Sequence, residues 1–168
     1  IMCELCAMVG PEVAKEVNGF DCDAPPAEPG PDLATVTEIG DAPANTSTSY
    51  SISVGDTFSG NLSFVGDRDW VAVTLTAGTT YQITLDGAGG SPLFDPYLRL
   101  YNAFGSLVAE NDDGGPGINS ALNYTIATTG TYYLAAGAYN DGYSGTYNLA
   151  ISETTPPPVF THDQIAQR

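Results

Sequence analysis

An acidic, glycine-rich loop carries the side chains best suited to chemistry in this sequence. It reads Asn-Asp-Asp-Gly-Gly over residues 111–115 and follows an alternating segment that starts after Asp95. Carboxylate and amide oxygens on a flexible chain are the ligands that calcium prefers, although the same residue types also form tight turns. We predict a calcium site formed by Asp95, Asn111, Asp112 and Asp113, with an ordinary turn as the alternative.

A second pair of carboxylates lies upstream, in the motif GDRDW of residues 66–70. We predict Asp67 and Asp69 as further calcium ligands, because the ion takes about six to eight oxygens. Turn or strand-edge positions are the alternative for both residues. The spacing matches neither an EF-hand loop nor a nonapeptide calcium repeat, so the prediction depends on residue type and clustering.

Residues suited to catalysis are sparse. His162 is the only histidine, and the sequence contains neither the zinc-protease motif HExxH nor the serine-hydrolase motif GxSxG. Two carboxylates could serve glycoside hydrolysis, but no spacing selects such a pair. We predict that this chain is not an enzyme by itself, although it fits as part of a larger protease.

Three cysteines, Cys3, Cys6 and Cys22, lie near the N-terminus. The first two have the spacing of half a zinc knuckle, and the second half is missing. One disulfide with a leftover thiol is the favoured interpretation, and the odd count also permits pairing between chains. A three-thiolate metal site is the alternative.

The tyrosines divide by register. Those on the apolar side of alternating segments are predicted to be core residues: Tyr81, Tyr124, Tyr132 and Tyr147. Those out of register are predicted to be exposed: Tyr97, Tyr101, Tyr133, Tyr139 and Tyr143. Because tyrosine gives a large contact area at small entropic cost, the exposed set is a candidate binding surface for protein or polysaccharide. Pairing across strands on a sheet surface is the alternative.

The charge balance limits the partners. The chain has 20 acidic and 4 basic residues, for a formal net charge of −16. It therefore lacks the basic patch that binding to nucleic acid or to an anionic membrane requires. It also contains no apolar run of about 18 residues that could span a bilayer. We predict neither a nucleic-acid nor a membrane partner.

From Thr46 onward, apolar and polar residues alternate with the period of a half-buried strand. About nine such segments are separated by turn residues: 51–54, 58–64, 69–76, 81–86, 96–102, 107–110, 121–128, 130–138 and 145–152. Strands repeating about every ten residues indicate an all-β fold. We predict an antiparallel β-sandwich, jelly-roll-like, with extended N- and C-terminal tails.

Composition divides the chain into three parts. Residues 1–45 carry nine acidic residues and one lysine, with five prolines between Pro25 and Pro43. This favours a largely extended segment with one short helix over residues 11–18. Residues 46–153 form the predicted sandwich. Residues 154–168 contain three consecutive prolines and are predicted to be a linker and the start of a following segment.

Residues 66–152 resemble the bacterial pre-peptidase C-terminal domain, a small β-sandwich appended to secreted proteases. Four pieces in the expected order carry the resemblance: GDRDW with the following VAVTLTAGTTYQITL, DPYLRLYNAFGSLVAENDDGG, GTYY at residues 130–133 and GTYNL at residues 145–149. The resemblance implies a non-catalytic accessory module, often associated with calcium. Such a module helps a secreted enzyme with substrate contact, processing or solubility.

The tail from Phe160 to Arg168 is similar to the entry helix of serralysin-type zinc metallopeptidases. The resemblance implies export by a C-terminal signal. Residues 1–9 lack the basic region of an N-terminal signal peptide. Three explanations are open: such a peptide has been removed, export uses another signal, or the protein stays inside the cell. The tail resemblance favours the second, so we expect an extracellular protein that is exported without a cleaved N-terminal signal peptide.

The expected function is a calcium-binding accessory module of a secreted bacterial metallopeptidase, whose partner is the attached peptidase domain or its substrate. The alternative is a structural subunit of an extracellular assembly, because edge strands and extended tails suit strand addition. In that case residues 24–54 or 154–160 would pair with a second copy of the chain.

Overall fold

The structure, a computed structural model, describes residues 33–154. Predictions about Cys3, Cys6, Cys22, the short helix over residues 11–18 and the linker with its following segment lie outside the described residues. Within the described range, no helix has the length and hydropathy of a membrane-spanning segment.

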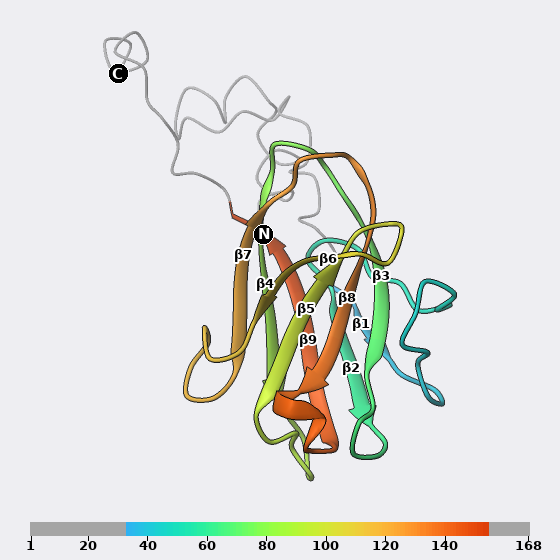
Figure 1. The fold of residues 1–168 in the computed structure, drawn as a ribbon, viewed down its shortest axis with the longest axis vertical. Coiled ribbons are helices and arrows are strands. Elements are labelled where there is room, and N and C mark those ends of the chain that lie inside the picture. The colour runs from blue at the N-terminus through green and yellow to red at the C-terminus, as the bar shows by residue number, and fades with distance from the viewer. Residues whose placement is uncertain (1–32, 155–168) are drawn as a thin grey trace, which may run out of the picture. The chain divides into compact units, whose positions relative to one another are not determined.

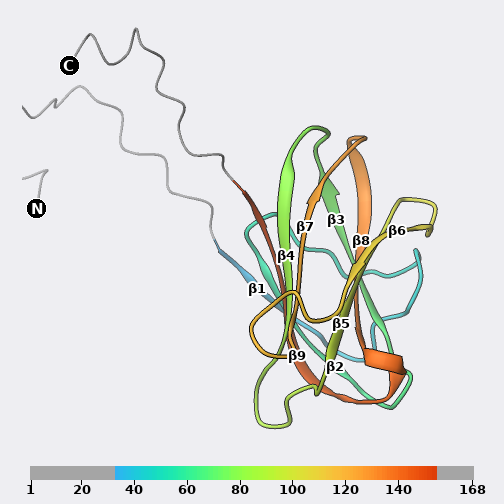
Figure 2. The same ribbon diagram turned by 60° about the vertical axis from the view of Figure 1, so that its left-hand side comes forward.

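Nine strands and one 3₁₀ turn make up the described chain. They are β1 (Thr35–Thr37), β2 (Thr57–Leu62), β3 (Asp69–Leu75), β4 (Thr80–Gly87), β5 (Pro96–Tyr101), β6 (Leu107–Asn111), β7 (Ser120–Thr125), β8 (Gly130–Ala138), η1 (Tyr139–Asp141) and β9 (Gly145–Glu153). Sheet A has five strands in the order β1-β2-β9-β4-β7, and sheet B has four in the order β3-β8-β5-β6. The two sheets lie face to face (Figures 1 and 2). The predicted all-β sandwich is confirmed.

Alternation along the strands produces the shared core. In β3, Val71 and Leu75 point between the sheets and are fully buried, whereas Thr74 is exposed. In β9, Leu149 is buried by the same alternation. Each fully buried aliphatic side chain stabilises the fold by roughly 1.5–3 kcal/mol relative to an exposed position. Burial on one face of each strand therefore fixes the pairing register.

The loops that follow the even-numbered strands meet at one end of the sandwich, the lower end in Figure 1. We call this the loop end; it comprises residues 63–68, 88–95, 112–119 and 139–144. Strands that are neighbours in sequence from β2 onward run in opposite directions, so every second connection returns to the same end. Segments far apart in the sequence therefore come together there.

The sandwich begins earlier than the boundary at residue 46 that composition predicts. β1 lies inside the acidic, proline-containing segment and pairs in parallel with β2, with Val36 opposite Phe58. Ala42 is buried as well. A three-residue strand is too short to give a periodic signal, so the sequence pattern does not reveal it.

The strand predicted over residues 51–54 is reduced to a single bridge between Ser51 and Ala72. The chain turns away at Gly55, whose φ is 103°. Asp56 stabilises this turn, because its Oδ2 accepts a hydrogen bond of 2.9 Å from the Ser53 amide.

The turn at residues 140–142 also differs from expectation. The sequence Asn-Asp-Gly at these positions predicts a hairpin turn, because Asn and Asp before Gly tolerate positive φ. β8 and β9 belong to different sheets, however, so the turn crosses between the sheets. Asn140 and Asp141 both have a φ of 52°, the left-handed conformation that Asn and Asp tolerate better than other non-glycine residues. Arg68 holds the turn through two hydrogen bonds to Asp141, of 2.8 and 2.6 Å.

Candidate cation site

Four carboxylates from two distant segments converge beside the loop end. Glu38 and Asp41 follow β1, Asp67 lies in the β2–β3 loop and Asp69 is the first residue of β3. Carboxylate oxygens of Glu38, Asp41 and Asp69 all lie within 4.8 Å of one another. Burial raises the pKa of Asp67, and the neighbouring Asp41 raises it further. We call these four residues the first carboxylate cluster.

Asp69 is the innermost member of the cluster and is 0% exposed. Its Oδ2 accepts a hydrogen bond of 2.6 Å from the Tyr147 hydroxyl. Its buried Oδ1 has no hydrogen-bond partner among the described residues. Burial raises the pKa of Asp69 to about 8. The hydrogen bond from Tyr147 lowers the pKa, and the nearby acidic side chains raise it further. An unpartnered buried oxygen is costly, and a cation is one way to satisfy it.

The surrounding backbone fixes two of the other carboxylates. Glu38 accepts hydrogen bonds from the amides of Ala42 (2.9 Å) and Asn61 (2.7 Å). Asp67 accepts hydrogen bonds from the amides of Ser63 (2.6 Å) and Arg68 (2.8 Å). Carboxylate oxygens have more than one lone pair, so these bonds orient the groups and leave capacity for a metal. Several pre-oriented hard oxygens fit a calcium ion.

Tyr147 reaches Asp69 because of a glycine on the adjacent strand. Tyr147 lies opposite Gly60 in the β2–β9 pairing, and a Cβ at Gly60 would overlap the Tyr147 ring and hydroxyl. Burial and the nearby Asp69 raise the pKa of Tyr147, so the hydroxyl stays a hydrogen-bond donor. Gly60 is therefore part of the support of the cluster.

A second carboxylate cluster contains three of the four ligands predicted in the acidic loop. Oxygens of Asp95, Asp112 and Asp113 lie within 4.8 Å of one another. Asp112 Oδ1 has no hydrogen-bond partner within residues 33–154, and burial together with Asp113 and Asp95 raises the pKa of Asp112. Unlike Asp69, these residues are half-buried or exposed. The second cluster is open to solvent.

Asn111, the fourth predicted ligand, makes hydrogen bonds to the backbone. Its Oδ1 accepts hydrogen bonds from the amides of Gly114 (2.8 Å) and Ala121 (3.1 Å). The side chain thus stabilises the turn after β6 and the start of β7. The turn alternative accounts for these contacts, and a ligand role for Asn111 stays a prediction.

Sequence reasoning missed Glu38 and Asp41. Both lie in the acidic N-terminal segment, where no local motif separates them from its other acidic residues. Only the parallel pairing of β1 with β2 brings them to Asp67 and Asp69. The one available signal is the short run Thr-Val-Thr before Glu38, which suits a strand.

The tyrosines predicted to be exposed fall into two groups. Tyr101 and Tyr133 pack on Trp70 with ring centroids 4.1 and 5.7 Å from the indole. Tyr133 also donates a 3.2 Å hydrogen bond to the Thr46 carbonyl. These two tyrosines therefore pack across strands on the outer face of sheet B. This is the arrangement given above as the alternative to a binding surface.

The remaining three tyrosines predicted to be exposed gather near the loop end. The Tyr97 and Tyr139 ring centroids are 6.4 Å apart, and Tyr143 packs on Phe94 at 4.9 Å. Among the tyrosines predicted to be core, Tyr81, Tyr132 and Tyr147 are buried and Tyr124 is half-buried.

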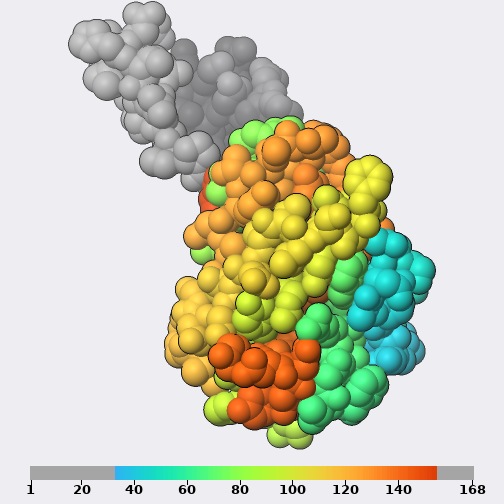
Figure 3. All heavy atoms as spheres, viewed as in Figure 1, coloured from blue at the N-terminus to red at the C-terminus, as the bar shows by residue number. Residues whose placement is uncertain are grey.

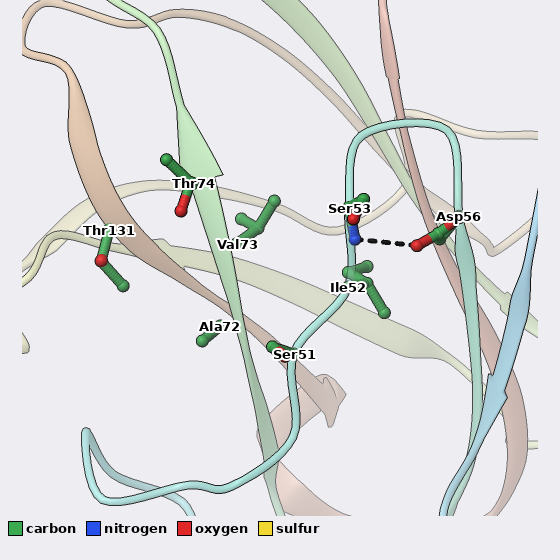
Figure 4. A pocket seen from close by; sticks show the side chains of 8 residues that line it. All are labelled: Ser51, Ile52, Ser53, Asp56, Ala72, Val73, Thr74 and Thr131. Carbon is green, nitrogen blue, oxygen red and sulfur yellow. Dashed lines mark hydrogen bonds between the residues drawn. The ribbon is translucent and has the colours of Figure 1, made fainter. Parts of the chain in front are cut away.

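A separate pocket of about 340 Å³ lies at the edge of sheet B, between β3 and the segment that bridges to it (Figure 4). Its lining is Ser51, Ile52, Ser53, Asp56, Ala72, Val73, Thr74 and Thr131. Its one carboxylate, on Asp56, accepts hydrogen bonds from the amides of Ala34 (3.0 Å) and Ser53 (2.9 Å). Asp56 is thus engaged in holding the backbone, and the pocket offers hydroxyl groups and strand backbone.

The fold and the buried carboxylates define a small all-β module with a candidate cation site. Residues 67–138 match the family described as the bacterial pre-peptidase C-terminal domain. This match over residues 67–138 confirms the resemblance seen in the sequence. The matched stretch is 72 of the 168 residues (138 − 67 + 1) and includes Asp67 and Asp69 but not Glu38 or Asp41.

Several solved structures are similar to this chain. The pre-peptidase C-terminal domain of a collagenase from Bacillus anthracis is 21% identical, with 61% of this chain and 93% of that chain covered and a TM-score of 0.49. PliG from Aeromonas hydrophila, a periplasmic inhibitor of g-type lysozyme, is 16% identical, with coverage of 71% and 99% and a TM-score of 0.42. PliG from Salmonella Typhimurium is 17% identical, with coverage of 62% and 99% and a TM-score of 0.35. The search of curated proteins found no match.

Proposed function

We propose that this sandwich is a non-catalytic, calcium-binding accessory module of a secreted bacterial metallopeptidase. The observation that carries the proposal is Asp69, a fully buried carboxylate with one oxygen lacking a partner in the described chain, placed among three further carboxylates. The family match to a domain that accompanies peptidases supports the accessory role.

Calcium would be held by Glu38, Asp41, Asp67 and Asp69. The ion would neutralise carboxylates that otherwise repel one another, and it would satisfy the buried oxygen of Asp69. It would also tie the segment after β1 to the start of β3. An ion that binds only the folded state stabilises it by RT ln(1 + [L]/Kd). The extracellular space, where calcium is abundant, is the expected location.

The positions of the two side chains with the most strongly raised pKa values support the non-catalytic role. Asp69 and Tyr147, whose pKa values are strongly raised, are both 0% exposed between the sheets. A catalytic acid or base must reach its substrate, so this pair suits a structural task. The module would then serve its enzyme through substrate contact, positioning or solubility.

The test is thermal unfolding of the full chain in calcium, in magnesium and in EDTA, together with isothermal titration of calcium. Calcium is expected to raise the unfolding midpoint of the unaltered chain and to leave Asp69→Asn unchanged. The double variant Asp112→Asn/Asp113→Asn is the matched control and is expected to keep the shift. An equal response of the unaltered chain to calcium and EDTA would remove the calcium part of the proposal.

The alternative of a structural subunit is favoured by one observation, the edge of sheet B. β3 is an edge strand, and within residues 33–154 its outer side is bridged at Ala72 by Ser51. Beyond that bridge lies the pocket of Figure 4, which is lined by Thr74 of β3 and by Ser51 and Ser53 of the bridging segment. An extended segment of a second copy could add there as a strand. Light scattering after size-exclusion chromatography tests this, and a monomer at micromolar concentration would exclude the assembly.

A further inference from the structure

An exposed aromatic cluster lies at the loop end. Phe94, Tyr139 and Tyr143 are 56%, 42% and 39% exposed. The Phe94 and Tyr143 rings meet edge to face with centroids 4.9 Å apart, although they come from different loops. In Figure 3 the turn around residue 140, coloured orange-red, forms the lower surface beside the green β2–β3 loop. Grouped exposed rings of this kind mark interaction sites more than scattered ones do.

The backbone beneath the cluster is held in an uncommon conformation. Within residues 33–154, the non-glycine residues with positive φ are Asp95 (56°), Asn140 (52°) and Asp141 (52°). All three lie in the two loops that carry the exposed rings. The Tyr139 amide donates a 2.8 Å hydrogen bond to the Asp95 carbonyl and joins the two loops. Backbone strain of this kind persists where the surrounding structure imposes it, often at binding sites.

Carboxylates without a paired cation among the described residues lie next to the cluster. Asp95 directly follows Phe94 and belongs to the second carboxylate cluster, with Asp112 and Asp113. The two basic residues of the described range, Arg68 and Arg99, are already engaged. Arg68 pairs with Asp141 at 2.6 Å, and Arg99 lies 3.8 Å from a Glu110 oxygen. The rings therefore border carboxylates that have no cation beside them in the described chain.

A contact between an arginine and a tyrosine ring within the described chain illustrates how the aromatic cluster at the loop end can bind a cation. The Arg99 guanidinium carbon lies 4.1 Å from the centroid of the Tyr97 ring, and Tyr97 is a neighbour of Tyr139. A cation over an aromatic face contributes roughly 0.5–1 kcal/mol at an exposed site, and more when water is excluded. Tyr139, Tyr143 and Phe94 are partly exposed, and an exposed aromatic face accepts a cation in the same way.

We propose that the loop end binds a cationic polypeptide segment of a partner protein. Lysine or arginine side chains would lie over Phe94, Tyr139 and Tyr143 and pair with Asp95, Asp112 and Asp113. Charge complementarity selects this partner, because an anionic polymer would be repelled and a neutral one would leave the carboxylates unpaired. The proposed contact residues include none of the four residues of the first carboxylate cluster, so the proposal does not rest on calcium at Asp69.

The experiment measures binding of fluorescein-labelled decalysine and deca-arginine to the full chain by fluorescence anisotropy. Decaglutamate and a ten-residue Gly-Ser peptide serve as charge controls, and EDTA is present throughout. The unaltered chain is expected to bind both cationic peptides. Phe94→Ala/Tyr143→Ala is expected to weaken this binding at least fivefold. Phe104→Ala is the matched control, because Phe104 is a 91% exposed ring in the β5–β6 turn at the opposite end of the sandwich.

A second pair of variants separates site binding from general attraction to a chain of net charge −16. Asp113→Asn at the loop end is expected to weaken decalysine binding more than Glu153→Gln, an exposed carboxylate at the far end of β9. Chemical-shift changes in a ¹⁵N spectrum are expected in residues 88–95 and 139–144. Equal losses from the loop-end variants and their controls would overturn the proposal. Tighter binding of the Gly-Ser peptide than of decalysine would also overturn it.

Discussion

The two carboxylate clusters share the same chemistry but differ in how the fold holds them. The first joins the segment after β1 to the start of β3 and includes a side chain that is 0% exposed. The second joins the two ends of the β5–β6 hairpin and is partly open to solvent. Water can solvate the second cluster when no cation is present, whereas it cannot reach Asp69. An ion in the first cluster would therefore stabilise the fold, while the second cluster is free to meet a partner.

The largest expected effect separates the clusters by their response to calcium. At a calcium concentration of about 100 Kd, the folded state gains about 2.7 kcal/mol, which corresponds to a rise of roughly 10 °C in a domain of this size. Asp69→Asn should abolish the gain, and Asp113→Asn should retain most of it. Differential scanning calorimetry with calcium and with EDTA measures both. A gain lost in Asp113→Asn and kept in Asp69→Asn would reverse the assignment.

The next effect concerns the hydrogen bond between Tyr147 and Asp69. Tyr147→Phe removes the donor from a buried carboxyl group and should lower the free energy of unfolding by about 2 kcal/mol. Urea denaturation in EDTA at pH 7 measures the loss. Tyr124→Phe, at a half-buried tyrosine of sheet A, is the control and should change little. Equal losses in the two variants would mean that the Tyr147 hydroxyl contributes nothing specific.

A third effect is the pH dependence in EDTA. Because burial raises the pKa of folded Asp69 to about 8, the folded state retains a proton that the unfolded state releases above pH of about 4. Stability from this proton is complete below that pH and is lost as pH rises toward 8, with a slope of at most about 1.4 kcal/mol per pH unit. Asp69→Asn should flatten the slope and be at least as stable as the unaltered chain at pH 8. An unchanged slope would contradict the assignment to Asp69.

The smallest effect tests the support of the second cluster. Ser120 is buried, and its hydroxyl bonds to the carbonyls of Asp112 (2.5 Å) and Asn111 (2.9 Å). Ser120→Ala should cost about 1 kcal/mol and should not alter the calcium response of the first cluster. Calorimetry of the variant in calcium and in EDTA gives both values. A reduced calcium shift would show that the two clusters are coupled.

The sequence predicted the second cluster better than the first for a physical reason. Asp95 and Asp112 flank two strands that form one hairpin, so a local pattern already implies that they meet. Glu38 reaches Asp69 only through the parallel β1–β2 pair, across 31 residues (69 − 38). Local periodicity carries no information about such a pairing. Most strands from β2 to β9 were predictable from their period of two, because they bury one face, as β3, β5 and β9 do.

The same reasoning explains the turn between β8 and β9. The residue types at Asn140 and Asp141 predict a left-handed backbone conformation, and the structure has this conformation at both positions. The destination of the next strand depends on the packing of the whole sandwich, because β9 lies between β2 and β4 of sheet A. Turn chemistry therefore gives the local conformation and leaves the topology open.

The central place of β9 has a consequence for synthesis. β9 pairs with both β2 and β4, yet it is the last of the nine described strands to leave the ribosome. Until residues 145–153 emerge, β2 and β4 lack their common neighbour, and Asp69 lacks the Tyr147 hydroxyl. Long-range pairings of this kind form late and slowly. The nascent module should therefore stay unfolded until β9 has been translated.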